Sequence, residues 1–149
     1  METPRTQRSP RVGVFATSDE VAKDIVDAAL KVHRALGPGL LESAYQACLA
    51  HELQRRRHRV ESEVALPLEF EQVRIEVGYR IDMRIDQLVL VENKTVEKIL
   101  PIHLAQLLTY LKLSGLSLGL IINWNVMLLR DGIQRVVRNH PEERCIEQK

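Results

Sequence analysis

Two carboxylates and a lysine in this sequence are spaced so that they could act together in metal-assisted hydrolysis. Glu92 and Lys94 are separated by one residue in "VENKTVEK" (residues 91–98). Because side chains alternate between the two faces of a β-strand, both would point to the same face. Asp82 would lie directly opposite Glu92 if the two segments form a hairpin whose turn is centred on Gln87. Asp82, Glu92 and Lys94 are therefore the candidate catalytic residues.

The chemistry that suits these three groups is hydrolysis of a phosphodiester. Facing residues of an antiparallel ladder have Cβ atoms about 4.5–5.5 Å apart, so two carboxylates there repel each other unless a cation compensates. Mg²⁺ prefers oxygen ligands, lowers the pKa of a bound water and stabilises charge on a phosphate. A lysine can orient the water or stabilise the developing charge. From spacing alone, a solvated sheet face on which Lys94 pairs with Glu92 or Asp82 stays open as the alternative.

The sequence around these residues predicts the hairpin that they require. "GYRIDMRID" (residues 78–86) alternates apolar and charged residues, as a half-buried strand does. "QLVLVENKTV" (residues 87–96) begins as a strand buried on both faces, and the junction of the two segments supplies the turn. Before them, "VESEVALPLEFE" (residues 60–71) predicts a strand interrupted by Pro67, which is typical of a sheet edge.

Helices are predicted on both sides of these strands. Thr17 and Glu20 form a capping box that begins the first helix, and "GPG" (residues 37–39) ends it. A second helix is expected over about residues 41–57, with an apolar stripe at helical spacing. A third is expected over about residues 103–114, closed by a glycine.

The C-terminal part predicts two further strands. "SLGLIINWN" (residues 117–125) is a buried strand, and "VMLLRDGIQRVV" (residues 126–137) is expected to form a short hairpin around its Asp-Gly pair. The order of two helices, three strands, a helix and two strands indicates a mixed α/β domain over residues 17–138. Residues 1–16 are expected to be a disordered tail, and residues 139–149 a polar C-terminal tail.

The bulk composition limits the class of protein. The chain has 149 residues and a formal net charge of +1, which favours one domain and argues against nucleic-acid binding through a broadly basic surface. A local basic groove stays open. The two cysteines, Cys48 and Cys145, are far apart, and the histidines lack metal-ligand spacing. Neither zinc nor a disulfide scaffold is expected, and a cytoplasmic location is predicted.

No membrane segment is expected. The most apolar stretch, "LKLSGLSLGLIINWNVMLL" (residues 111–129), is interrupted by a lysine, glycines and asparagines, whereas a bilayer span needs about 20 mainly apolar residues. The N-terminal "METPRTQRSPRVG" (residues 1–13) lacks the apolar core of a signal peptide.

Several segments together resemble a known family. "GLLESAY" (residues 39–45) fits the pattern G-x-x-E-x-x-Y, and the surrounding "VHRALGPGLLESAYQACLAHEL" (residues 32–53) is similar to the opening of the GxxExxY family. That family is assigned to the PD-(D/E)XK nuclease-like superfamily. "GYRIDMRID", "VENK" and "HLAQLLTYLK" follow in the family's order. The resemblance covers about residues 21–137.

The resemblance implies a fold and an active site. The fold would be α/β, with a PD-(D/E)XK nuclease-like core of αβββαβ type and a mixed sheet flanked by helices. Asp82 would be the motif's aspartate, and Glu92 and Lys94 its ExK. Glu42 would complete a metal site with Asp82 and Glu92, holding Mg²⁺ or Mn²⁺. One departure concerns the middle of ExK, where Asn93 stands at a position expected to face the core; a buried amide requires hydrogen-bond partners.

The resemblance also implies residues that position the substrate. Gln106 and Tyr110 are similar to the QxxxY element of recombination-type nucleases, and Tyr45 of the GxxExxY pattern would join them. Without the family, Gln106 and Tyr110 would be a polar edge on one face of a helix, and Glu42 with Tyr45 an ordinary surface pair.

The implied function is Mg²⁺-dependent hydrolysis of nucleic-acid phosphodiester bonds, with DNA favoured over RNA. The alternative is a catalytically inactive member of the fold that binds nucleic acid or protein. A third hypothesis is a dimeric scaffold that uses the apolar "LIINWNVMLL" (residues 120–129) as an edge, so a homodimer stays open.

Overall fold

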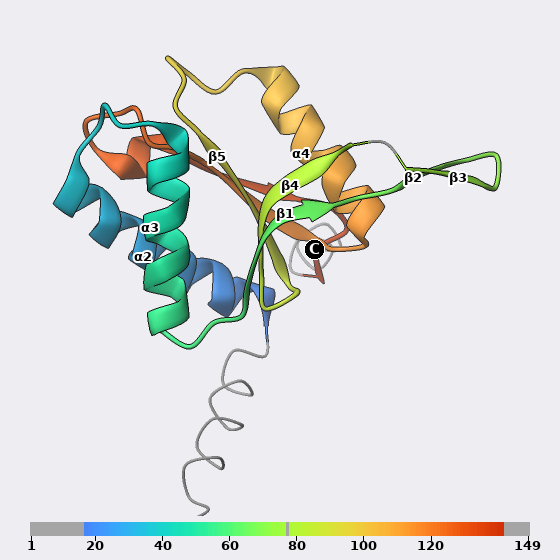
Figure 1. The fold of residues 1–149 in the computed structure, drawn as a ribbon, viewed down its shortest axis with the longest axis horizontal. Helices are drawn as coiled ribbons and strands as arrows, with labels where there is room; N and C mark the ends of the chain where they lie inside the picture. The colour runs from blue at the N-terminus through green and yellow to red at the C-terminus, as the bar shows by residue number, and fades with distance from the viewer. Residues whose placement is uncertain (1–16, 77, 142–149) are drawn as a thin grey trace, which may run out of the picture.

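A five-stranded sheet with helices on both faces forms the domain. The computed structural model describes residues 17–76 and 78–141. Helices α2 (Ser18–Leu36) and α3 (Glu42–Arg55) lie together on one side of the sheet, and α4 (Pro101–Ser114) lies on the other (Figure 1). Each face of the sheet buries its own apolar cluster, one under α2 and α3 and one under α4. The sheet is therefore the middle layer of three.

The sheet has the connectivity expected for the αβββαβ core. Its strands are β1 (Val60–Ala65), β4 (Arg80–Ile85), β5 (Val89–Lys94), β6 (Leu118–Asn123) and β7 (Ile133–Val137), in the order β1-β4-β5-β6-β7. Strands β1, β4 and β5 form an antiparallel meander, and β5 and β6 are parallel, joined by α4. The predicted fold class is confirmed, including the place of β1 at the sheet edge.

A small second hairpin is an addition to the predicted elements. The segment expected to be one interrupted strand divides into β1 and β2 (Leu68–Phe70), because Pro67 has no N–H to donate to a ladder. β2 pairs with β3 (Val73–Ile75) through a turn at Glu71 and Gln72, both with positive φ. This arm extends away from the main sheet (Figure 1).

The predicted helices are present, with one correction to a buried face. The Thr17 side chain accepts a hydrogen bond from the Glu20 N–H at 3.1 Å, which is one of the two hydrogen bonds of the expected capping box. In α3 the expected apolar stripe of Leu41, Ala44, Cys48 or Leu49, and Leu53 is confirmed at Leu49 and Leu53, whereas Leu41 is 77% exposed and Cys48 is exposed. The buried apolar residues of this helix are Tyr45, Leu49 and Leu53, because the helix turns its Tyr45 face toward the sheet.

The expected hairpin over residues 126–137 is wrong. The Asp-Gly pair lies in a short 3₁₀ helix, η1 (Leu129–Gly132), and β7 pairs with β6 rather than with residues 126–129. Gly132 passes so close to β6 that an added Cβ would lie 2.2 Å from the Asn123 carbonyl oxygen. Within the segment of the scaffold hypothesis, β6 lies between β5 and β7, so this strand is not the sheet edge that the hypothesis expected.

The C-terminal boundary of the packed domain extends past residue 138. His140, expected in a polar tail, is buried and pairs with Ser117 Oγ at 2.8 Å through Nδ1. Its Nε2 lies 3.0 Å from Asp19 Oδ1. The imidazole thereby joins the start of α2 to the start of β6. The disordered tail expected over residues 1–16 lies outside the described residues, and so do residues 142–149 of the expected polar C-terminal tail.

A second histidine fixes the hairpin that carries the candidate site. His58 Nδ1 lies 2.6 Å from Asp86 Oδ2, and Nε2 lies 2.6 Å from Asp24 Oδ2. Asp86 also accepts the Arg59 N–H at 2.7 Å. His58 therefore links the turn between β4 and β5 to helix α2 through hydrogen bonds.

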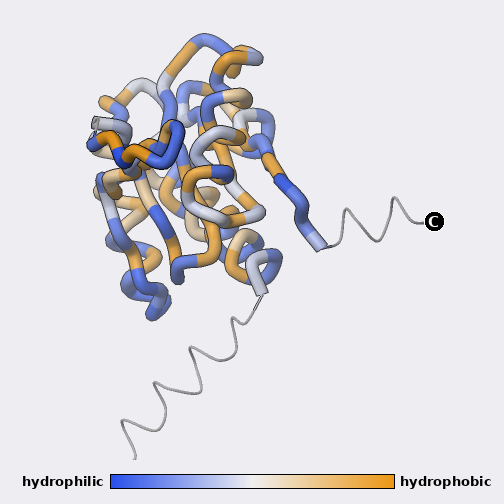
Figure 2. Tube along the Cα trace, turned by 90° about the vertical axis from the view of Figure 1, so that its right-hand side faces the viewer, coloured by the Kyte–Doolittle hydropathy of each residue, from blue (hydrophilic) through white to orange (hydrophobic). Residues whose placement is uncertain are grey.

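The described helices include none long and apolar enough to cross a bilayer. Hydrophobic and hydrophilic residues alternate along the chain instead of gathering in one apolar segment (Figure 2).

Candidate active site

The β4–β5 hairpin has the predicted register. Its ladder pairs Met83 with Val91 and Ile85 with Val89, so the same register places Asp82 opposite Glu92. The turn is centred as expected on Gln87, which has positive φ. The two candidate carboxylates therefore stand at the end of the ladder, one on each strand.

Asp82 and Glu92 hold each other in place through the backbone. The Asp82 N–H donates to Glu92 Oε2 at 3.1 Å, and the Asn93 N–H donates to Asp82 Oδ2 at 2.8 Å. Each carboxylate thus satisfies an N–H of the opposite strand where the regular ladder stops. This exchange fixes both side chains between β4 and β5 rather than in solvent.

Asp82 lies where β4 changes from one apolar cluster to the other. Ile81 packs in the cluster under α4, whereas Met83 packs in the cluster under α2 and α3. On β5, Leu90 belongs to the α4 side, and Glu92 shares its face by the two-residue period. Asp82 lines the hollow beside the start of α3, and its charge also acts on Tyr110 of α4.

Burial shapes the acid–base properties of the pair. Glu92 is only 7% exposed, and this burial, followed by repulsion from Asp82, raises the pKa of its carboxyl to about 8. The pKa of the half-buried Asp82 is also raised. Desolvation is the main cause, and the hydrogen bond from the Asn93 N–H counteracts part of the rise. Two adjacent buried carboxyl groups are difficult to ionise at the same time, and a bound cation would make it easier for both to lose their protons.

Lys94 lies among the carboxylates without forming a direct ion pair with Glu92 or Asp82 in the described part of the chain. It is half-buried at the end of β5. Its ammonium opposes the raised pKa of Glu92, of Asp82 and of Glu42. This position differs from the solvated sheet face with a simple lysine salt bridge, which was the alternative from spacing.

Glu42 approaches the pair from α3, as the first residue of that helix. Its carboxyl has a raised pKa, through desolvation and then through Asp82, so the two groups sense each other's charge. Among the residues described, however, no three Asp, Glu, His or Cys side chains are gathered as a group that could hold a metal ion. The expected three-carboxylate set is therefore not assembled, and Asp82 with Glu92 forms its fixed part.

Asn93 has the partners that a buried amide needs. It is fully buried; its Oδ1 accepts the Trp124 indole N–H at 2.9 Å. Its Nδ2 lies 3.3 Å from Gln46 Oε1 and 3.4 Å from Met83 Sδ. Asn93 therefore connects β5 to α3 and to the end of β6 rather than weakening the strand.

Gln46 is a site residue that sequence reasoning missed. Besides Asn93, its Nε2 donates to the Asp82 carbonyl oxygen at 3.3 Å and to Glu63 Oε2 at 3.0 Å. Gln46, Glu42, Glu63 and Asp82 line one hollow of about 470 Å³ between α3, β1 and β4. The signal available in the sequence was Asn93 itself, because an amide in a core position requires a polar partner from another element.

The expected role of Tyr45 in positioning a substrate needs correction. The side chain has no exposed surface, and its ring stacks on Trp124 with centroids 4.8 Å apart. Its hydroxyl donates to the Gly37 carbonyl and accepts the Leu40 N–H. Tyr45 therefore fixes the loop before α3, and through that loop the placement of Glu42.

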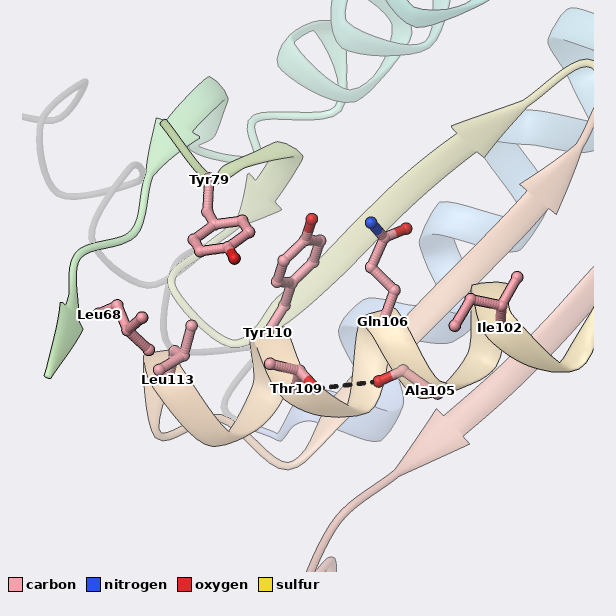
Figure 3. Close-up of a pocket in the computed structure, with 8 residues that line it drawn as sticks. All are labelled: Leu68, Tyr79, Ile102, Ala105, Gln106, Thr109, Tyr110 and Leu113. Atoms are coloured by element: carbon pink, nitrogen blue, oxygen red, sulfur yellow. Dashed lines mark hydrogen bonds between the residues drawn. The ribbon is translucent and has the colours of Figure 1, made fainter. Parts of the chain in front are cut away.

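Gln106 and Tyr110 are brought to the other side of the same carboxylates. Both project from one face of α4 (Figure 3), and both line a hollow of about 280 Å³. The pKa of Tyr110 is raised by burial and then by Glu92, and the Gln106 side chain opposes that rise. Tyr110 thus lies near the carboxylates with Gln106 beside it, and Tyr79, which also faces the hollow, is an addition to the predicted residues.

Comparison with known proteins gives one result for the whole domain. No curated protein and no solved structure matched the chain. Residues 19–136 match the family described as the PD-(D/E)XK nuclease superfamily. The matched region runs from the start of α2 to within β7, so it includes the hairpin with Asp82 and Glu92 and the helices on both faces of the sheet. The chain belongs to the PD-(D/E)XK nuclease superfamily.

Proposed function

We propose that this protein hydrolyses nucleic-acid phosphodiester bonds with the help of Mg²⁺ or Mn²⁺. The observation that carries the proposal is the Asp82–Glu92 pair. Hydrogen bonds from opposite strands hold the two carboxylates, and Glu92 has a pKa of about 8. A pair that is costly to ionise alone gains most from a bound cation.

Asp82 and Glu92 would hold the cation, and Glu42 would reach it from the start of α3. Oxygen donors of this kind suit a hard divalent ion that keeps several waters. Such an ion supplies Lewis acidity toward a phosphate and toward a water. Glu42 is exposed, so its side chain is free to adjust on binding, whereas the pair on the hairpin is already fixed.

Lys94 and the α4 residues would act on the substrate. The Lys94 ammonium lies close enough to counteract part of the rise in pKa of all three carboxyls, and from there it can orient the attacking water or stabilise charge on the phosphate. Gln106 and Tyr110 would position the nucleotide beside the site.

The same proposal includes the finer assignments. Membership of the GxxExxY family is supported by its pattern residues, since Gly39 adopts φ 105°, Glu42 senses the charge of Asp82 and Tyr45 fixes the loop. DNA is favoured over RNA as substrate, and a homodimer and a cytoplasmic location are proposed with it.

The test is a cleavage assay on labelled DNA and RNA, single- and double-stranded, with Mg²⁺, Mn²⁺ or EDTA. Glu92→Gln serves as the inactive comparison because it keeps the side-chain shape and removes the charge. We expect cleavage of at least one substrate that EDTA abolishes and that Glu92→Gln reduces by orders of magnitude. Cleavage that survives EDTA would contradict the proposal.

A second candidate function is an inactive member of the fold that binds nucleic acid or protein. The observation that favours it is that the described residues gather no three-ligand metal group. It predicts binding of a partner with no metal-dependent cleavage of any substrate in the same assay.

A further inference from the structure

The hollow beside α4 has walls that suit a flat, uncharged group. Eight residues line it: Leu68, Tyr79, Ile102, Ala105, Gln106, Thr109, Tyr110 and Leu113. None of the eight carries a charge, so the hollow is not built to hold a phosphate. Its volume of about 280 Å³ lies just below the range of about 300–1,000 Å³ that is usual for drug-sized ligands. A single heterocyclic ring system fits that size and chemistry.

An exposed aromatic ring forms one side of this hollow. Tyr79 is 44% exposed, and its ring projects from the chain just before β4 toward α4 (Figure 3). Its backbone is fixed, because its carbonyl accepts the Leu66 N–H at 2.9 Å. An exposed ring held by a fixed backbone is a ready stacking surface, and stacking of a base on an aromatic ring contributes about 1–3 kcal/mol.

The polar groups at the hollow are few and of the amide and hydroxyl type. The Gln106 amide points into the space beside Tyr110 (Figure 3) and offers both donors and an acceptor. The Thr109 hydroxyl donates to the Ala105 carbonyl oxygen at 3.1 Å, so it could only accept a hydrogen bond from a ligand. One amide at the edge of an apolar slot can orient a base without requiring a particular sequence.

The hollow adjoins the candidate active site. Tyr110 is shared between them: it lines the hollow, and its hydroxyl senses the charges of Glu92 and Asp82. Tyr79 is likewise close in sequence to Asp82, just before the same strand. A nucleotide whose phosphate lies at the carboxylates therefore has its neighbouring base within reach of the hollow.

We infer that this hollow is a nucleobase subsite, in which the base next to the scissile phosphate stacks on Tyr79 and contacts Gln106. The inference rests on the proposed function for the position of the phosphate. It also specifies the substrate class. A base inside a duplex is stacked and paired and cannot enter such a slot unless it is extruded, so the substrate is single-stranded nucleic acid or an unpaired end.

Binding of labelled oligonucleotides to the full chain in EDTA tests the subsite without cleavage. The probes are a fluorescein-labelled single-stranded thymidine 15-mer, the same length of duplex, and a 15-mer of abasic residues, each followed by fluorescence anisotropy. The variants are Tyr79→Ala, Tyr79→Phe and the control Phe70→Ala. Phe70 is a matched control because it is an exposed aromatic residue on the neighbouring arm that does not line the hollow.

We expect Tyr79→Ala to weaken binding of the thymidine strand about tenfold, within the range for loss of one base–aromatic stack. Tyr79→Phe, which keeps the ring, and Phe70→Ala should bind like the wild type. The abasic strand should bind the wild type weakly and show no further loss with Tyr79→Ala. Melting curves establish that Tyr79→Ala is folded, and if it is not, Tyr79→Leu replaces it with the same expectation.

Three results would overturn the subsite: equal binding by Tyr79→Ala and wild type, equal binding of duplex and single strand, or no binding of any oligonucleotide. The last would point to a hollow that takes an apolar protein side chain instead. The cleavage assay separates the two proposals. Metal-dependent cleavage that is indifferent to Tyr79 removes the subsite alone, whereas Tyr79-dependent binding without any cleavage removes the hydrolysis alone.

Discussion

Asp82 and Glu92 exchange hydrogen bonds across two strands: the Asp82 N–H donates to Glu92 Oε2, and Asp82 Oδ2 accepts the N–H of Asn93, the residue after Glu92. The side chains thereby replace ladder bonds that the hairpin no longer makes. Both carboxylates are held in place before any ligand arrives. The energetic consequence is a pair that repels in the absence of a cation, and that consequence can be measured.

Asp82→Asn should separate the charge of Asp82 from its structural role. The amide oxygen can still accept the Asn93 N–H, and above about pH 8, where Glu92 is ionised, removal of the Asp82 charge relieves the repulsion. We expect the variant to melt at or above the wild-type temperature in EDTA. Excess Mg²⁺ or Mn²⁺ should stabilise the wild type by about 2.7 kcal/mol at one hundred times Kd, and the variant far less, because a hard cation prefers a charged oxygen.

The measurement is a pair of melting curves for each protein, in EDTA and in excess metal. The matched control is Glu61→Gln on β1, because the Glu61 carboxylate pairs with Arg84 instead of facing Glu92. This control should respond to metal like the wild type. An Asp82→Asn protein that melts well below wild type in EDTA and gains equally with metal would show that Asp82 is structural.

Glu92 should make the metal-free protein less stable at high pH. Its pKa of about 8 in the folded state lies above the ordinary value of 4.5, so the folded protein retains a proton that the unfolded chain has lost. The free energy of unfolding therefore falls as pH rises from about 4.5 to about 8, by about 1.4 kcal/mol per pH unit as an upper limit. Urea unfolding in EDTA at several pH values measures it, and Glu92→Gln should remove this part of the slope.

His58, which lies outside the candidate site, should also make the free energy of unfolding fall as pH rises. Its two carboxylate partners, Asp86 and Asp24, raise its pKa against the effect of burial, so the protonated form stabilises the fold at low pH and loses that effect as pH rises through the raised pKa. We expect His58→Gln to lower the melting temperature more at pH 6 than at pH 9. An equal drop in melting temperature at both pH values would mean that the His58 contacts with Asp86 and Asp24 do not depend on the charge of the imidazole.

The indole of Trp124 should matter through one hydrogen bond. Trp124→Phe keeps a ring stacked near Tyr45 but leaves the buried Asn93 Oδ1 without its donor, which costs about 1–3 kcal/mol. In an Asn93→Ala background the same change should cost less, since the acceptor is absent. Equilibrium unfolding of the four proteins gives the coupling energy, and additive effects would contradict the bond's role.

The hairpin could be predicted from sequence because its information is local. Alternation in β4, the buried run in β5 and the intervening turn fix the register, and the register alone places Asp82 opposite Glu92. The partners of Asn93 could not be predicted in this way. Trp124 reaches it only after a parallel crossover through α4, and Gln46 reaches it from a helix that precedes the sheet.

The same distinction explains the other differences. The GxxExxY pattern identified Tyr45 but not its direction, and burial against Trp124 decided that the ring serves the loop and not a substrate. His140 looks in sequence like part of a polar tail, because the Asp19 that binds it lies at the opposite end of the chain. Tyr79 looks like one residue of an alternating strand, and only the packing of α4 shows the hollow beside it.

Metal-dependent hydrolysis at this hairpin is tested most sharply by the single-turnover cleavage rate of Lys94→Ala beside Lys98→Ala, on the best nucleic-acid substrate with Mg²⁺ or Mn²⁺. Lys94 lies among the carboxylates, whereas Lys98 is an exposed lysine after the strand. We predict that Lys94→Ala is folded yet slower by orders of magnitude, that Lys98→Ala stays within a few-fold of wild type, and that EDTA abolishes all cleavage. Equal rates for Lys94→Ala and wild type, or cleavage that persists in EDTA, would show that the hydrolysis does not occur at this site.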